Sequence, residues 1–250
     1  MTTARESLLD IRHDERAMIR TLTMQRLEKA NALDATMVQA LDAELAGLTA
    51  ATDQGATVIL RSAHRAFSAG FDLSGVEDQT EGDILLRFVH IEGLLQRLRR
   101  GPLASIAVIE GAAYGAGADL AIACTWRIGT PRARFRFPGF RFGVALGTRH
   151  LAAIAGQDRA RQILLENRMI PAEEALEWGL LTHLVEPAEI ETTIATLAGA
   201  PADLPGAAAA RIIGMTRTDT DDADLADMVR SLAEPGLKNR IAAYLRAGAA

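Results

Sequence analysis

Two glycine-containing turns constrain how this chain can fold. They lie at residues 67–73 (FSAGFDL) and 111–120 (GAAYGAGADL). Each turn follows an apolar run typical of a β-strand, at residues 57–61 and 105–110, and a helix-like stretch follows each turn. Repetition of strand, turn and helix predicts right-handed crossovers and a parallel sheet. Turns of this kind can present backbone N–H groups at a strand's carboxyl end, where two such groups could converge on one oxygen.

The rest of the chain divides into an α/β part and a helical part. Alternating apolar and polar residues at 8–13 and 18–24, separated by residues 14–16, predict an opening hairpin. Apolar residues at helical spacing predict helices at residues 35–51, 82–100 and 116–124. From about Leu146 the pattern is mostly helical. We therefore expect an α/β core at 1–195 and a helical C-terminal region at 196–250 (the break marked by Pro201 and Pro205).

Composition excludes several classes of protein. A chain of 250 residues that is 49% hydrophobic can bury the core of one large domain. Its net charge of −5 and its scattered basic residues argue against nucleic acid as the main partner. No apolar run is long enough to span a bilayer and the first residues lack a signal-peptide pattern, so we expect a cytoplasmic protein with no membrane partner. Cys124, the only cysteine, is expected to be a buried and inert thiol.

Four stretches, taken in order, resemble the crotonase superfamily, which is also called the enoyl-CoA hydratase/isomerase family. They are residues 26–34 (RLEKANALD), 66–73 (AFSAGFDL), 106–124 and 171–180 (PAEEALEWGL). Their order and spacing match the family over nearly the whole chain. The resemblance implies an α/β fold built as a spiral of ββα units, with a helical C-terminal region that forms trimers, or hexamers made of two trimers. It also implies an acyl-CoA thioester as substrate, with no metal and no cofactor other than this coenzyme A.

The resemblance also assigns roles to individual residues. The two amides that hold the thioester oxygen map onto Phe71 and Ala116. Glycine is more usual at position 116, but alanine can supply the same N–H if its φ angle is negative. Contacts to substrate or coenzyme A map onto Lys29, Ala69, Gly70, Asp72, Leu73 and Gly115.

The two glutamates that hydratases of this family use are not both present. The first maps onto Asp119, whose carboxylate is one methylene shorter, and the second maps onto Gly139. The loop at residues 143–148 is also shorter than is usual in the family. Asp119 is therefore either the remaining acid–base group or an aspartate that caps a helix. Without the second carboxylate, ordinary hydration is in doubt, whereas isomerisation, decarboxylation or carbon–carbon bond hydrolysis requires only an enolate.

Other residues could complete the site. Glu92 flanks the apolar stripe of the helix at 82–100, so it is either a relocated second carboxylate or a solvated surface glutamate, while His90 points to the surface. Phe140 and Arg141 lie beside Gly139, and either Arg141 or Arg149 could bind a carboxylate on the acyl group or be an exposed loop arginine. Three readings stay open: an enolate-forming enzyme, a hydratase that uses Asp119 with Glu92, and a non-catalytic protein that binds CoA esters.

Overall fold

The computed structural model describes residues 8–15, 18–51, 56–205 and 207–248. Six strands form one sheet in the order β1-β2-β3-β4-β6-β9. They are β1 (Leu9–Asp14), β2 (Ile19–Met24), β3 (Thr57–Ser62), β4 (Ala104–Ile109), β6 (Trp126–Gly129) and β9 (His183–Leu184). Only β1 and β2 pair antiparallel; all other neighbours are parallel. Both the opening hairpin and the parallel sheet are confirmed, although Arg16 in the hairpin turn lies outside the described residues, as do residues 1–7, where no signal peptide was expected.

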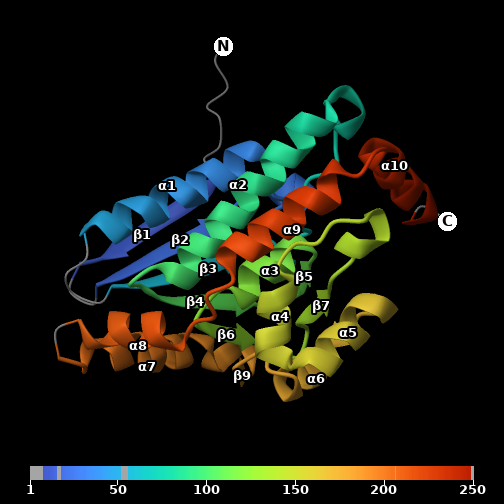
Figure 1. Cartoon of the computed structure of the whole chain (residues 1–250). Helices are drawn as coiled ribbons and strands as arrows, with labels where there is room; N and C mark the ends of the chain where they lie inside the picture. The colour runs from blue at the N-terminus through green and yellow to red at the C-terminus, as the bar shows by residue number, and fades with distance from the viewer. Residues whose placement is uncertain (1–7, 16–17, 52–55, 206, 249–250) are drawn as a thin grey trace, which may run out of the picture.

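Helices cover both faces of this sheet (Figure 1). On one face lie α1 (Ala35–Ala51) and α2 (Glu81–Arg100), whose bounds agree with the periodicity. Helix α2 begins with a capping box, because Thr80 and Asp83 each accept a hydrogen bond from the other's backbone amide. Its predicted apolar stripe is buried. On the other face, α7 (Ile190–Ala202) packs Ile190 and Ile194 against β4 and β6.

A second, three-stranded sheet includes the start of the second glycine turn. Its order is β5-β7-β8, formed by β5 (Ala112–Tyr114), β7 (Arg134–Arg136) and β8 (Ile170–Pro171). Helix α3 (Ala116–Ile122) begins two residues after β5, two residues shorter than expected. The remaining short helical turns are η1 (Leu27–Lys29), η2 (Val76–Asp78), η3 (Gly139–Phe142) and η4 (Pro187–Glu189).

The C-terminal half is helical, as expected. Its helices other than α7 are α4 (Thr148–Ala155), α5 (Gln157–Glu166), α6 (Ala172–Glu177), α8 (Ala208–Thr216), α9 (Asp221–Ala233) and α10 (Leu237–Gly248). Helix α9 runs along α2, and α10 lies beside the loop that contains η3 (Figure 1). The expected boundary between residues 195 and 196 falls inside α7, because Ile190–Ala202 is one continuous helix.

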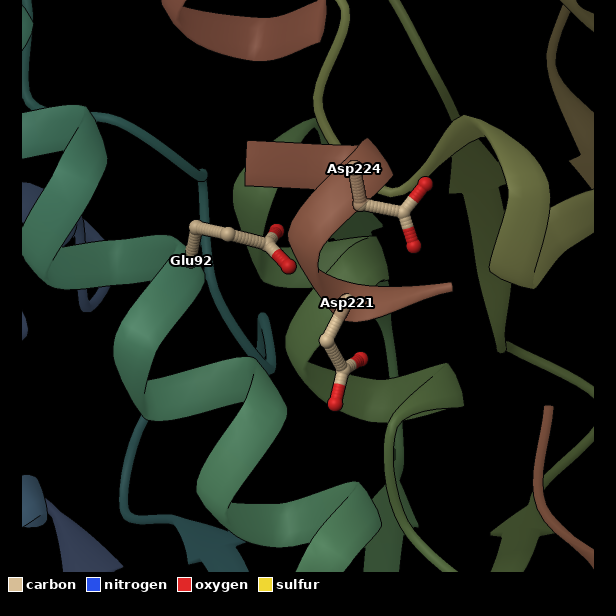
Figure 2. Close-up of side chains that lie close together, drawn as sticks. All are labelled: Glu92, Asp221 and Asp224. Atoms are coloured by element: carbon tan, nitrogen blue, oxygen red, sulfur yellow. The ribbon is translucent and has the colours of Figure 1, made fainter. Parts of the chain in front are cut away.

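A charged cluster joins α9 to α2. Glu92 from α2 and Asp221 and Asp224 from α9 lie close together (Figure 2). Arg99 donates to Glu92 at 2.7 Å and to Asp221 at 3.1 Å, and its side chain is buried. Glu92 is only 1% exposed, so the solvated surface reading of this residue is wrong. The periodicity of α2 could not show this, because α9, which packs against that flank, lies far away in the sequence.

Arginines balance the acids of this cluster. Arg100 pairs with Asp221, and Arg149 from α4 pairs with Asp224 at 3.1 Å and also with Asp227. With Arg99, three guanidinium groups therefore face the three carboxylates of Figure 2, and a metal ion is not needed to neutralise them. The cluster is a set of ion pairs that holds the C-terminal helices on the core.

Replacing Asp221 with asparagine tests this role. Asp221→Asn leaves the guanidinium groups of Arg99 and Arg100 short of one buried counter-charge, so we expect the free energy of unfolding to fall by about 3 kcal/mol. Urea unfolding at neutral pH measures the change. The matched control is Asp222→Asn on the exposed side of the same helix, which should stay within about 0.5 kcal/mol of the parent. Equal effects of the two variants would show that the cluster does not stabilise the fold.

Candidate active site

Hydrogen bonds from buried polar side chains hold the first glycine turn in place. The Ser68 hydroxyl donates to the Asn31 carbonyl at 2.7 Å and accepts from the Gly70 amide at 3.1 Å. The Asn31 side-chain amide in turn donates to the Phe67 carbonyl. Gly70 has φ +89, and a Cβ there would collide with the carbonyl oxygen of Tyr114 in the second turn. The turn therefore requires glycine both for its conformation and for its contact with the second turn.

The second turn packs directly against the first. Gly115 adopts φ +50 and ψ −127, a combination open to glycine, and Ala116 then starts α3 with a negative φ. A Cβ on Gly117 would lie 2.6 Å from the Ser68 Cβ, so the two turns meet at a distance that only glycine permits. Alanine at 116 is compatible with the backbone, which is the condition expected from the sequence.

The amides of Phe71 and Ala116 belong to one wall of a single cavity. Both residues line it, and the Cβ position of Gly70, the residue before Phe71, lies 3.2 Å from the Ala116 nitrogen. Within the described chain, neither amide donates to a backbone acceptor among the contacts between elements. Ala116 is the first residue of α3, where helical N–H groups lack intrahelical partners. Two free donors next to each other are suited to hold an oxygen that gains negative charge.

The cavity is small and mostly apolar. It measures about 70 Å³. Its walls are formed by Ala69, Phe71, Leu73, Phe88, Gly115, Ala116, Asp119, Phe137, Pro138, Gly139, Phe140, Phe142, Val144, Leu146, Leu164 and Tyr244. Asp119 is the one carboxylate among these described residues. Proton transfer inside the cavity therefore has a single carboxyl group available.

Asp119 is buried without a hydrogen-bond partner for its Oδ1 atom in the described structure. Burial raises the pKa of Asp119 well above its ordinary value, the negative charge of Glu92 raises it further, and Arg99 opposes both. Gly147, with φ +62, lies directly against the carboxylate, because a Cβ there would collide with Oδ1. An aspartate that merely caps a helix would have a bonded carboxylate, so the geometry favours the acid–base reading over the cap.

Gly139 packs closely against the loop that contains Val144. Gly139 lies in the cavity wall, and its carbonyl accepts from the Val144 amide at 2.9 Å. A Cβ on Gly139 would lie 2.8 Å from the Val144 carbonyl oxygen. With the loop in this position, the backbone of Val144 takes the room that a side chain at 139 would need.

Several residues assigned from the sequence lie elsewhere than in the cavity wall. Lys29 is exposed on η1. The Asp72 carboxylate contacts Arg26 at 2.6 Å and accepts from Ser74. Its burial raises the pKa of Asp72, but the Ser74 and Arg26 hydrogen bonds outweigh this and lower it. Asp72 thus fastens the first turn to the stretch at 26–34 through its side chain.

Two arginines considered as carboxylate binders are already engaged. Arg149 pairs with Asp224 and Asp227. Arg141 is not part of the cavity wall and donates to the Glu166 carbonyl at 3.2 Å. Ala69, Gly115 and Leu73 do line the cavity, as does Phe140, which is 45% exposed at its rim. Glu92 is absent from the cavity wall among the described residues and acts on Asp119 only through its charge.

The structure adds two residues that sequence reasoning missed. Tyr244 from α10 lines the cavity and stands on Phe142, with ring centroids 5.1 Å apart. Arg87 from α2 lies 4.1 Å over the Phe71 ring and donates to the Asp72 carbonyl at 2.7 Å, which supports the first turn from the α2 side. No motif marks either residue; each depends on a helix that arrives from elsewhere in the chain.

Two further expectations concern cysteine and membranes. Cys124 is buried, and burial raises the pKa of its thiol to about 12, which confirms an inert cysteine. Within the described ranges, the helices are each too short or too polar to cross a bilayer.

Comparisons with known proteins show what the chain as a whole is similar to. The family model described as enoyl-CoA hydratase/isomerase matches residues 14–229. A crystal structure from Bordetella parapertussis, described by the same words, has a TM-score of 0.91 and 42% identity over 95% of this chain and 98% of that one. The probable enoyl-CoA hydratase echA6 of Mycobacterium tuberculosis is 32% identical over 71% of this chain and 72% of its own. The 4-chlorobenzoyl coenzyme A dehalogenase-2 of an Arthrobacter species is 27% identical over 90% and 87%.

The coupling of Gly139 to the loop can be tested through stability. Gly139→Ala places a Cβ against the Val144 carbonyl, so we expect the free energy of unfolding to fall by about 1–3 kcal/mol. Gly93→Ala is the matched control, because a Cβ at this helical position meets nothing within 4 Å. That variant should gain about 1 kcal/mol. Thermal unfolding of both proteins gives the signs. A neutral Gly139→Ala would contradict the close packing of the loop.

Proposed function

Because this chain belongs to the enoyl-CoA hydratase/isomerase family, we propose that it is an enzyme that forms an enolate from an acyl-CoA thioester and moves one proton through Asp119. The names of its relatives, which include an enoyl-CoA hydratase and a coenzyme A dehalogenase, support a CoA thioester as substrate. The observation that carries the proposal is the single unpartnered carboxylate in the cavity that also contains the amides of Phe71 and Ala116.

The proposed reaction is an isomerisation that moves a carbon–carbon double bond of the acyl group into conjugation with the thioester carbonyl. The Asp119 carboxylate removes a proton from the substrate, and the C–H electron pair moves into the thioester carbonyl to give the enolate. The amides of Phe71 and Ala116 donate to the enolate oxygen, each stabilising it by roughly 3 kcal/mol. The protonated Asp119 then returns its proton to another carbon of the same conjugated system. One carboxyl group thus suffices, whereas addition of water calls for a second.

The raised pKa of Asp119 fits this cycle. A group that must accept a proton and return it works best with a pKa near the working pH, and burial moves the pKa of Asp119 in that direction. The apolar wall formed by phenylalanines keeps water from the enolate and leaves the acyl group in an environment without other charges. No cofactor beyond the substrate's own coenzyme A and no metal is part of this proposal.

Asp119→Asn tests the assigned group. Turnover should fall by roughly 10²- to 10⁴-fold, because the amide can neither accept nor return the proton, while binding of the thioester persists. The variant should also be more stable at pH 7. Folded Asp119 retains a proton that the unfolded chain releases above its ordinary pKa of 3.8, so wild-type stability falls as pH rises and the advantage of the variant shrinks toward acid pH. Unchanged turnover would remove Asp119 from the mechanism.

A panel of thioesters distinguishes the reaction from its alternatives. We expect 3-butenoyl-CoA to be converted to crotonyl-CoA, and in D₂O mass spectrometry should find product without deuterium, because Asp119 returns the proton that it removed. Hydration of crotonyl-CoA at a comparable rate would contradict the single-carboxylate mechanism. Product from a malonyl-type or a 3-oxoacyl thioester only would move the enzyme to decarboxylation or carbon–carbon hydrolysis. Tight binding without product from any member would favour a non-catalytic protein.

Glu92→Gln separates the proposed enzyme from a hydratase that uses Glu92 as its second group. Removing the charge of Glu92 takes away one of the effects that raise the pKa of Asp119, so the acidic limb of the pH–rate profile should move to lower pH while the maximal rate stays similar. Loss of turnover at every pH would instead place Glu92 in the chemistry.

Assembly through the C-terminal helices is the second part of the proposal. We infer a homotrimer, or a hexamer of two trimers, in the cytoplasm. Apolar side chains exposed on α8 support an interface there, with Ile212 53% and Met215 85% exposed. Light scattering after gel filtration tests the stoichiometry.

A further inference from the structure

A second cavity, of about 270 Å³, lies at the opposite end of α3 from the Ala116 amide. Its walls come from α2, α3, α4, α8 and the segments that follow α3 and α8. They comprise Leu98, Arg99, Ile122, Ala123, Cys124, Thr125, Arg127, His150, Ala153, Ile154, Ile213, Thr216, Arg217 and Thr218. This cavity shares no lining residue with the first one. None of these described residues is an aspartate or a glutamate, although acids outnumber bases in the chain, 32 to 27.

Arg127 brings an uncompensated charge to this cavity. Its guanidinium donates to four backbone carbonyls, those of Cys124, Thr125, Gly179 and Leu180, and pairs with no carboxylate in the part of the chain that the structure describes. These bonds orient the group but leave its positive charge without a counter-ion. Burial lowers the pKa of Arg127, because removing the guanidinium from water destabilises its charged form. A half-buried guanidinium without a counter-ion attracts an anion.

Two other arginines, Arg217 and Arg99, also line this cavity. Arg217 lies at the exposed rim, on the segment between α8 and α9, and has no ion pair with a described carboxylate. Arg99 is neutralised by Glu92 and Asp221, which lie behind the cavity wall. The net charge that faces the cavity is therefore that of Arg127 and Arg217.

His150 from α4 also lines this cavity. Its Nε2 lies 2.8 Å from the Ile122 carbonyl, so the ring donates there. Burial lowers the pKa of His150 to about 4; the charges of Arg99 and Arg127 act in the same direction, and the Ile122 hydrogen bond and Asp224 oppose them. The histidine is therefore neutral at physiological pH.

We propose that this cavity binds an organic anion, with a phosphate or carboxylate head near Arg127 and Arg217 and a short apolar body against Leu98, Ile122 and Ile213. The volume exceeds what an inorganic anion fills, and about half of the wall is aliphatic. The Arg217 guanidinium is exposed, so it is free to turn onto the head group. This binding does not depend on the function proposed for the first cavity.

Calorimetry with simple probes on the full chain tests the proposal. The probes are hexyl phosphate, hexanoate, 1-hexanol and inorganic phosphate, each titrated in the presence of saturating free coenzyme A to occupy the first cavity. We expect hexyl phosphate or hexanoate to bind at least about tenfold more tightly than 1-hexanol and than inorganic phosphate, since both the charge and the apolar body contribute. Which of the two anions binds better identifies the head group.

Charge reversal at the rim supplies the second arm. Arg217→Glu should weaken binding of the better anion by about tenfold or more, with Arg217→Gln between it and the parent. The control, Arg132→Glu, makes the same charge change at an exposed position outside the cavity wall and should leave binding unchanged. The proposal is overturned if coenzyme A abolishes binding, if Arg217→Glu binds as the parent does, or if inorganic phosphate binds as tightly as hexyl phosphate.

Discussion

The contact between the two glycine turns is the constraint on which the candidate active site depends. Gly70 touches the Tyr114 carbonyl and Gly117 touches Ser68, so neither position has room for a Cβ. Only this approach brings the Phe71 and Ala116 amides to the same wall of one cavity. The buried hydrogen bonds of Ser68 and Asn31 hold the first turn at that distance. The first turn is thus fixed by the fold itself, with Phe71 in the wall of the cavity.

The chemistry of the cavity follows from what surrounds Asp119. The loop that contains Val144 and Gly147 packs on this site. Gly147 lies against the Asp119 carboxylate, and the Val144 backbone leaves no room for a side chain at Gly139. Asp119, whose buried Oδ1 has no hydrogen-bond partner among the described residues, has a raised pKa because burial disfavours its charged form. The close approach of Val144 to Gly139 leaves Asp119 as the one carboxylate among the described residues of the cavity wall.

The C-terminal helices complete the molecule from outside the sheet. The ion pairs of Arg99 and Arg149 attach α9 to α2 and α4, and α10 then adds Tyr244 to the first cavity. The same packing buries Glu92 and places its charge where it acts on Asp119. The C-terminal region is therefore part of the site as well as of the fold.

Local patterns were enough to predict the hairpin, the parallel strands and the bounds of α1 and α2, because period and capping residues act over a few positions. They also located both turns, since the glycines that follow each strand are visible in the sequence, whereas Asp119 was singled out by the resemblance to the enoyl-CoA hydratase/isomerase family. Three features needed the tertiary structure: the burial of Glu92, the presence of Tyr244 in the cavity, and the pairing of Asp72 with Arg26. Each depends on contact between segments far apart in the chain. Spacing along one element determines which residues share a face, but only packing decides what covers that face, and with it which charges are paired and which remain free to react.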